Sequence, residues 1–296
     1  MAIARQSFLP YHASKSMRGD PMAESLTLAQ QHLYTFQACP RRFYLRYLVH
    51  VPWPEAPLDS ELELAYERGR RFHRWVERRF LGLPIAGEGT RDPVLESWWT
   101  TFEHDAPALP DGRRFAETSL TVPIGPDGRH RLTGRFDLLI VGPAADGKPA
   151  SSLFDWKTGE PREMARLVRA WQTRVYLFVL AEGGTALVPQ LPEAFAPDRL
   201  AFIYWYVAEP ATPRRIAYDR VTHHRNRAEL EAIVAGIDHQ LTAGEWPLTD
   251  DWKECRHCPY RAHCGRQAAG QDSQDISIVD EDGLEPEDLW LEPQWA

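Results

Sequence analysis

The N-terminal third of the chain carries hydrophobic side chains at the three-to-four-residue spacing of helices. This pattern predicts a helical entry over residues 25–48 and a second helix over residues 61–81, with prolines separating the two. A short further helix contains Trp98, Trp99 and Phe102. The second helix is also rich in arginine, including Arg70, Arg71 and Arg74.

The hydrophobic period then changes to two, which is typical of strands. Alternation predicts a meander of three strands over residues 115–124, 129–141 and 152–157. The segments between them carry turn residues, Pro126-Asp127-Gly128 and Asp146-Gly147. We therefore expect three consecutive antiparallel strands in the middle of the chain.

The helical period returns after the meander. It predicts a helix over residues 161–181, whose apolar stripe comprises Met164, Leu167, Val168, Trp171, Val175 and Phe178. The continuous apolar run at residues 200–207 predicts a buried strand, and residues 214–218 and 226–241 predict another strand and a last helix. From residue 61 the order is α-β-β-β-α-β, which indicates an α/β fold.

Charge is distributed unevenly along the chain. The formal net charge of -8 argues, taken alone, against a nucleic-acid partner. However, nine acidic residues and no Lys or Arg lie in residues 271–296, which leaves the remainder close to neutral. We interpret residues 267–296 as an acidic disordered tail, a docking peptide for a partner, or a DNA mimic. Residues 1–24 are interpreted as a flexible arm.

The sequence contains no recognisable targeting or membrane segment. The longest apolar run, residues 175–181, is far shorter than the roughly eighteen residues that a membrane span needs. The N-terminus lacks the apolar core of a signal peptide. These features predict a cytoplasmic protein without a membrane partner.

Four cysteines form the first candidate site. Cys255, Cys258 and Cys264 are spaced C-x2-C-x5-C, and Cys39 lies far upstream. A reducing cytosol disfavours disulfides, and four thiolates complete one tetrahedral zinc site or one iron–sulfur cluster. The spacing does not choose between the two metals, and unrelated thiols are the third interpretation. If Cys39 is a ligand, the site ties the start of the fold to its end.

Acidic and basic residues in the meander form the second candidate site. Asp155 and Lys157 flank Trp156, so on a strand they share one face while Trp156 points to the other. Such a pair can hold a divalent cation and position a water, or it can be a surface ion pair. Asp137 enters a hydrophobic strand, where an unpaired charge is costly, although it can also cap a turn.

Two further motifs lie on the predicted helices. His73 sits at the flank of an apolar stripe, as a metal ligand or as an ordinary packed histidine. Gln172 and Tyr176 are four residues apart, so they share one helix face and can reach a substrate, or form an amphipathic flank.

Taken together and in this order, His73, Asp137, Asp155-Trp156-Lys157 and Gln172-x3-Tyr176 resemble the PD-(D/E)XK nucleases of the RecB type. The segments ACPRRFYLRYL around Cys39 and ECRHCPYRAHC near the end are similar to those of AddB-like nuclease domains and CRISPR-adaptation exonucleases. The resemblance covers about residues 25–266. It implies a restriction-endonuclease-like core with a central mixed sheet, a helical N-terminal extension and a C-terminal cluster-binding region.

The resemblance also implies a cofactor set. His73, Asp137, Asp155 and the Trp156 carbonyl would bind Mg2+ or Mn2+, Lys157 would orient the attacking water, and Gln172 and Tyr176 would support the site. Glu117 is a possible additional acid. The four cysteines would bind a 4Fe-4S cluster, with zinc as the alternative that spacing leaves open.

The expected function is a metal-dependent DNA exonuclease acting on single-stranded ends in repair or recombination. Arg70, Arg71 and Arg74 would attract the DNA backbone. No P-loop motif is present, so a helicase or repair partner would have to supply any unwinding. The alternatives are a CRISPR-adaptation nuclease that trims spacer precursors and a non-catalytic DNA-binding assembly subunit.

Overall fold

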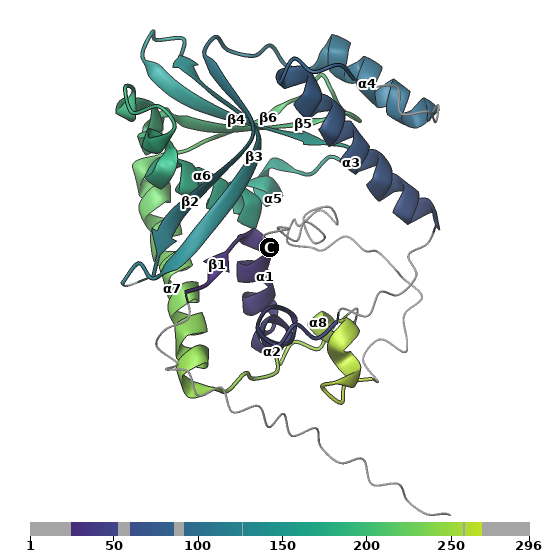
Figure 1. Ribbon diagram of the computed structural model, residues 1–296, viewed down its shortest axis with the longest axis vertical. Coiled ribbons are helices and arrows are strands. Elements are labelled where there is room, and N and C mark those ends of the chain that lie inside the picture. Colours follow the sequence, from purple (N-terminus) through teal and green to yellow (C-terminus); the bar gives the residue numbers. More distant parts are fainter. Residues whose placement is uncertain (1–24, 53–59, 86–91, 126, 257, 268–296) are drawn as a thin grey trace, which may run out of the picture.

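The computed structural model describes residues 25–52, 60–85, 92–125, 127–256 and 258–267 (Figure 1). The expected flexible arm, the turn residue Pro126 and the acidic tail beyond Gln267 lie outside the described residues. No helix in the described ranges combines the length and apolar character needed to cross a bilayer.

A mixed six-stranded sheet forms the centre of the molecule, as the sequence predicts. Strand order is β1-β3-β4-β5-β6, with β2 paired to β3. β1 pairs with β3, and β4 with β5, in parallel, whereas the other pairs are antiparallel. The strands are β1 (Thr27–Leu28), β2 (Arg113–Ile124), β3 (His130–Pro143), β4 (Pro149–Lys157), β5 (Leu200–Tyr206) and β6 (Arg214–Ala217).

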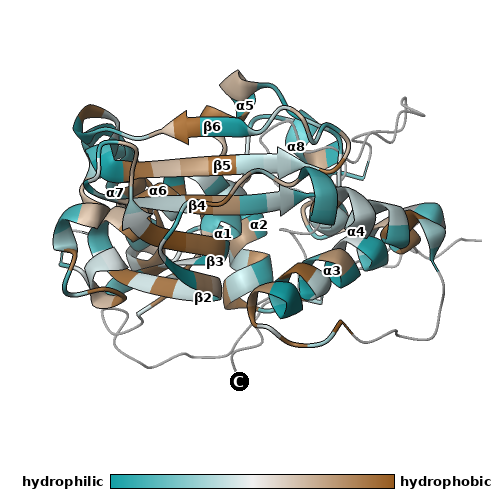
Figure 2. Cartoon of the chain, turned by 90° about the horizontal axis from the view of Figure 1, so that it is seen from above, coloured by the Kyte–Doolittle hydropathy of each residue, from teal (hydrophilic) through white to brown (hydrophobic). Residues whose placement is uncertain are grey.

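Helices cover both faces of this sheet (Figures 1 and 2). The α-helices are α1 (Gln30–Ala38), α2 (Pro40–Phe43), α3 (Ser60–Phe80), α4 (Pro93–Asp105), α5 (Met164–Arg169), α6 (Trp171–Gly183), α7 (Arg220–Ala243) and α8 (Lys253–Arg256). A π-helical turn, η1 (Tyr44–Leu48), follows α2, and four 3-10 turns are η2 (Gly184–Ala186), η3 (Pro192–Phe195), η4 (Pro197–Arg199) and η5 (Pro259–Ala262).

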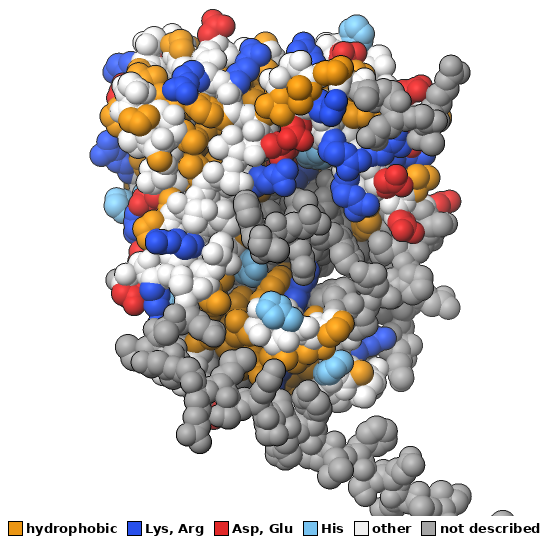
Figure 3. All heavy atoms as spheres, viewed as in Figure 1, with side chains coloured by type: hydrophobic (Ala, Val, Ile, Leu, Met, Phe, Trp, Pro, Cys, Tyr) orange, Lys and Arg blue, Asp and Glu red, His pale blue; other side chains and the backbone are white. Residues whose placement is uncertain are grey.

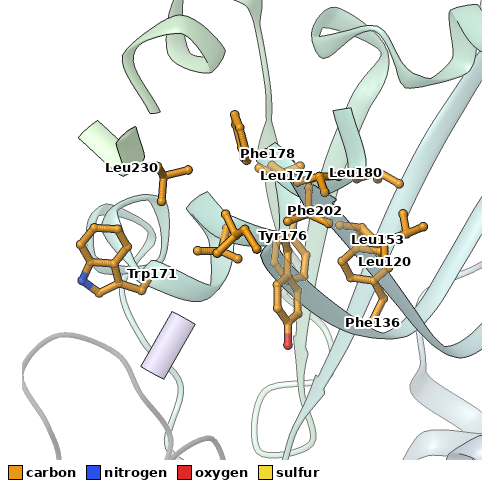
Figure 4. Packing of buried hydrophobic residues seen from close by; sticks show 14 of the residues in the cluster. Leu120, Phe136, Leu153, Trp171, Tyr176, Leu177, Phe178, Leu180, Phe202 and Leu230 are labelled. Atoms are coloured by element: carbon orange, nitrogen blue, oxygen red, sulfur yellow. The ribbon is translucent and has the colours of Figure 1, made fainter. Parts of the chain in front are cut away.

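The two faces of the sheet have separate hydrophobic cores. The first core packs α1, α6 and α7 against the sheet, and Figure 4 shows its centre, where the Tyr176 ring lies against Phe136 and Phe202. The second core packs α3 and α4 against the opposite face around Phe72 and Trp156. A helix layer on each face is what a largely buried sheet requires, because each face must exclude water.

The N-terminal helical entry differs from its prediction. Residues 27–28 form a short strand, and the helical stretch breaks at Cys39, whose extended backbone has φ -163° and ψ 109°. The cause is Pro40, because a proline disfavours helical conformation in the residue before it. The break separates α1 from α2 and leaves Cys39 buried between them.

The helix expected over residues 161–181 is also broken, at Ala170, where ψ is 139°. The predicted apolar stripe is therefore wrong in its first part: Met164 and Val168 are 41% and 42% exposed. The remaining stripe residues, Leu167, Trp171, Val175 and Phe178, are buried as predicted. Because Ala170 is extended, α6 does not continue the turns of α5. The side chains of α5 therefore do not extend the apolar stripe of α6.

Candidate active site

The candidate site lies where the backbone pairing of the meander is interrupted. The β2–β3 ladder pairs Ala116 with Leu138 and Thr118 with Phe136, and skips the facing positions Glu117 and Asp137. The β3–β4 ladder ends next to the same place, at Leu138 and Phe154. One carboxylate oxygen of Asp137 instead accepts a hydrogen bond from the Trp156 backbone N–H at 3.0 Å. The side chain thus bridges the two strands where main-chain pairing ends.

The side-chain alternation of both strands shifts by one residue at this interruption. In β3, Phe136 and Leu139 face the same core, although they are three residues apart, and Leu138 faces the other. In β2, Glu117 has φ 48°, a left-handed backbone conformation that costs about 1 kcal/mol or more for a residue with a side chain. Such strain is typical of functional positions held by their surroundings.

Helix α3 brings His73 to this point. Its neighbours Phe72 and Val76 are buried in the second core, which fixes the helix against the sheet. His73, Glu117 and Asp137 each offer a ligand atom, and these three atoms all lie within 4.8 Å of one another. His73 Nδ1 is 3.3 Å from Asp137 Oδ2. The structure therefore groups Glu117, the possible additional acid, with two of the expected ligands.

Asp155 and Lys157 lie in a second, adjoining set of contacts on β4. Both are buried, and the Lys157 ammonium is 3.0 Å from Asp155 Oδ2. Gln172 Nε2 donates to Asp155 Oδ1 at 2.7 Å. Trp156 between them is fully buried in the second core, on the opposite face as predicted. Asp155 is not part of the tight three-residue group.

The orientation of Gln172 is fixed by Tyr204, which pairs with Asp155 in the β4–β5 register. The Tyr204 hydroxyl donates to Gln172 Oε1 at 3.3 Å and lies 2.8 Å from the Thr173 hydroxyl. An amide whose oxygen faces a hydroxyl donor must point its NH2 group at the carboxylate. Sequence analysis missed Tyr204 and Thr173. The one available signal was the pair of tyrosines, Tyr204 and Tyr206, inside an otherwise apolar run.

The ring of Tyr176 packs in the first core. It is only 9% exposed and its ring stacks on Phe202. A Cβ atom at residue 134 would lie 3.1 Å from the Tyr176 ring, so Gly134 provides the space for it. Gln172 and Tyr176 therefore share a helix face as expected, with Gln172 reaching the carboxylate and Tyr176 filling the core.

The two facing carboxyl groups have pKa values shifted in opposite directions. Burial, together with the charge of Asp137, raises the pKa of Glu117 to about 7. Burial acts to raise the pKa of Asp137 too, but His73, the Trp156 N–H and Lys157 outweigh it and lower the pKa. Arg135 contacts Glu117, with Nε 2.7 Å from a carboxylate oxygen. Opposed shifts in neighbouring acids are typical of sites that handle protons or cations.

This donor set fits a divalent cation. Two carboxylate oxygens are hard ligands of the kind that Mg2+ and Mn2+ prefer, and one imidazole nitrogen adds a ligand that transition metals accept. A cation between the three side chains would also offset the unfavourable approach of two acids in a half-buried place. The residues present therefore suit a metal, with Asp155 adjacent to the group.

The three arginines expected to contact DNA are not equivalent. Arg71 is only 8% exposed, so most of its side chain is packed against the protein. Arg70 and Arg74 are exposed on α3, on the side of the helix that flanks His73. Figure 3 shows Lys and Arg side chains gathered over α3.

The four cysteines are brought together at the opposite end of the molecule. All are free thiols; Cys39 and Cys255 are buried, and Cys258 and Cys264 are half-buried. Burial raises the pKa of Cys264, and the other three cysteines add to this because they lie close enough to repel its thiolate. Arg266 donates to Cys255 Sγ at 3.2 Å. We refer to these four cysteines as the cysteine clamp.

Other contacts join the same chain ends around the cysteine clamp. Arg42 binds the Glu254 side chain at 2.9 Å, and the Tyr260 hydroxyl donates to the Val51 carbonyl at 2.9 Å. Trp246 stacks on Phe43, with ring centroids 5.8 Å apart. The thiols thus sit where the N-terminal helices meet the C-terminal segment.

The comparison with known families agrees with this architecture. Residues 27–265 match the PD-(D/E)XK nuclease superfamily. A solved structure described as "Crystal structure of SSO0001" is similar at 14% sequence identity and a TM-score of 0.35, over 83% of this chain and 88% of the other. No curated protein matches the sequence.

Proposed function

The chain belongs to the PD-(D/E)XK nuclease superfamily, and we propose that it is a metal-dependent DNA exonuclease that hydrolyses phosphodiester bonds at single-stranded ends in repair or recombination. The observation that carries this proposal is the group formed by His73, Glu117 and Asp137 beside the Asp155–Lys157 pair. Nucleases of this superfamily generally use a divalent metal, and DNA is the substrate that the family implies.

We assign His73, Asp137, Glu117, Asp155 and the Trp156 carbonyl to the ligand set. When bound, Mg2+ or Mn2+ lowers the pKa of a coordinated water and neutralises charge on the scissile phosphate. Asp137 is held for this role by the Trp156 N–H, and Asp155 by Gln172. For Asp155 the assigned atom is Oδ2, which faces Lys157.

Lys157 is the residue that we assign to the water and the phosphate. Its ammonium lies 3.0 Å from Asp155 Oδ2 and carries N–H donors of the kind that bind a water or a phosphoryl oxygen. Arg70 and Arg74, exposed next to His73 on α3, would guide the DNA backbone toward this point.

We further propose that residues 25–266 form one nuclease domain, in which the cysteine clamp binds a 4Fe-4S cluster, as in the RecB- and AddB-like type. A cluster held by four thiolates is anionic, and Arg42 and Arg266 place positive charge beside the thiols. Anaerobic purification with iron and sulfide assays tests this assignment. Stoichiometric zinc without iron would replace the cluster with the zinc alternative.

The test of the proposed activity uses 5′- and 3′-labelled single strands with Mg2+, Mn2+ or EDTA. We expect cleavage that requires the metal, releases nucleotides from one end and spares circular strands. Asp155→Asn should abolish it, whereas Asp146→Asn, an exposed aspartate at the far end of the same strand pair, should not. Full cleavage by Asp155→Asn, or cleavage in EDTA, would overturn the assignment.

A further inference from the structure

A groove lies beside the edge strand β6. Thr173, next to Gln172 in the chain, is among its lining residues, whereas none of the candidate metal ligands lines it. Figure 2 shows α5 and β6 at the same edge of the sheet. The cavity between them and the start of α7 has a volume of about 250 Å3. Residues of α5, α6, β6 and α7 line it.

The floor of this groove is apolar. Leu177 and Ile216 are buried beneath it. Met164 and Val168 on α5 line it while remaining 41% and 42% exposed, although their spacing in the sequence is that of core residues. Apolar side chains that line a cavity and stay uncovered mark a place where a further apolar group can bind.

The rim of the groove is positively charged. Arg174, Arg215 and Arg225 line it, and among the described lining residues none is acidic. Arg174 is bound to Glu229, whereas Arg215 and Arg225 are exposed. The groove therefore suits a ligand that combines apolar side chains with negative charge.

A nucleic-acid strand fits this groove less well than a peptide does. Proteins that bind single strands stack bases on accessible aromatic rings. The one aromatic residue among the described lining residues, Tyr218, is only 4% exposed. β6 is also the last strand in the sheet order, and an edge strand offers backbone groups to an added peptide.

The chain itself carries a segment of matching chemistry. Residues 283–296 read GLEPEDLWLEPQWA, with Leu289, Trp290 and Leu291 directly after acidic residues and no Lys or Arg. The groove lies at the N-terminal end of α7, a helix of 24 residues and thus about 36 Å long. The roughly twenty residues between Gln267 and Leu289 can extend well beyond that distance, to about 70 Å.

We propose that the acidic C-terminal segment of this chain, residues 283–296, docks in the groove between α5, β6 and α7. An apolar side chain of Leu289-Trp290-Leu291 occupies the cavity, and the acidic residues lie against Arg215 and Arg225. Because the segment is tethered, its effective concentration reaches the millimolar range, so a weak contact suffices. This inference stands apart from the proposed nuclease activity.

Hydrogen–deuterium exchange on the full-length chain tests it. Replacing Leu289, Trp290 and Leu291 with Ser should speed exchange in β6 and α5 by about 10-fold, because docking protects them. Arg215→Glu with Arg225→Glu should do the same, and adding Glu285→Lys, Glu287→Lys and Asp288→Lys should restore protection. The control Arg114→Glu with Arg131→Glu reverses two exposed arginines elsewhere and should leave β6 unchanged.

Two results would overturn the proposal. One is unchanged exchange in β6 and α5 when the three apolar tail residues are replaced. The other is weaker binding of a labelled single strand by the Arg215→Glu, Arg225→Glu variant without any change in exchange, which would assign the groove to DNA. The restoring charge swap keeps the test decisive if the arginine variant alone folds poorly.

Discussion

The candidate active site around His73, Glu117, Asp137 and Asp155, hereafter the acid site, and the cysteine clamp both bring together residues of metal-binding type. The two sites are held together in different ways. The ligands of the acid site lie on α3, β2, β3 and β4, whose packing and pairing hold them in place. The cysteine clamp joins Cys39 to residues more than 200 positions later through a few side-chain contacts. Loss of a ligand should therefore impair chemistry in the first region and the fold in the second.

Loss of the cysteine clamp should have the largest effect. Cys39→Ser, or removal of the proposed cluster, would open a loop of more than 200 residues, and closing such a loop is worth roughly 5 kcal/mol. We expect the free energy of unfolding in urea, measured anaerobically, to fall by up to that amount. Ala262→Ser, at an exposed position of η5, is the matched control. An unchanged midpoint for Cys39→Ser would remove the difference between the two regions.

A substitution in the acid site should reduce activity and leave stability nearly unchanged, which is the opposite of the effect expected for the cysteine clamp. Asp137→Asn removes a charge but can still accept the Trp156 N–H, so the fold should persist. We expect cleavage to fall at least 1,000-fold, about 4 kcal/mol in the transition state, with weakened Mn2+ binding by calorimetry and little change in the melting temperature. A large fall in melting temperature would show that this site, too, holds the fold together.

Acid should weaken the clamp side of the molecule. His32, packed on Tyr47 in the N-terminal helices, accepts a hydrogen bond from the Ala29 N–H. Burial lowers the pKa of His32 to about 4, so the folded state binds this proton less readily than the unfolded state. The stability that its neutral ring provides is complete above pH 6.5 and is lost as the pH falls toward 4, by up to about 3 kcal/mol. The free energy of unfolding should be measured for wild type and His32→Phe at several pH values. We expect it to depend less steeply on pH in the variant.

Glu117 should contribute the reverse slope when no metal is present. The raised pKa of Glu117, about 7, means that the folded state holds its proton more tightly than the unfolded state. Its contribution is therefore complete below about pH 4.5 and is lost as the pH rises through 7. In EDTA, Glu117→Gln should be more stable than wild type at pH 8 and similar to it at pH 4. Equal stability at both pH values would contradict the burial of this carboxyl.

The smallest expected effect concerns Tyr204 and tests whether its hydroxyl positions Gln172 or only adds to packing. Tyr204→Phe removes the hydroxyl that orients Gln172 and should cost about 1 kcal/mol of stability. It should also lower kcat about 10-fold with little change in KM, and shift the pH profile, because Gln172 no longer fixes Asp155. Tyr260→Phe loses a similar hydroxyl contact in the clamp region and should cost stability without changing kcat. Equal kinetics for the two variants would show that Tyr204 has only a structural role.

Helix and strand periods were read correctly wherever one face of an element is buried and the other is not. The meander strands β2 and β3 therefore match their predictions closely, whereas β5, buried along its whole length, was predicted from its continuous apolar run. The errors at Cys39 and Ala170 arose where a single extended residue breaks a helix inside an uninterrupted hydrophobic pattern. Periodicity does not register such a break, because the apolar residues on each side keep nearly the same spacing.

The sequence by itself determined the class of fold and the residue types of both sites. Motif order placed His73 on a helix and Asp137 on a strand, and it placed Asp155 and Lys157 together on one face of the next strand, since the face follows from a period of two. Only the tertiary structure decided that Glu117 joins His73 and Asp137 while Asp155 pairs with Lys157 and Gln172. This grouping depends on where the pairing between strands is interrupted and on how α3 packs on the sheet. These are long-range contacts, and no local pattern of residues specifies them.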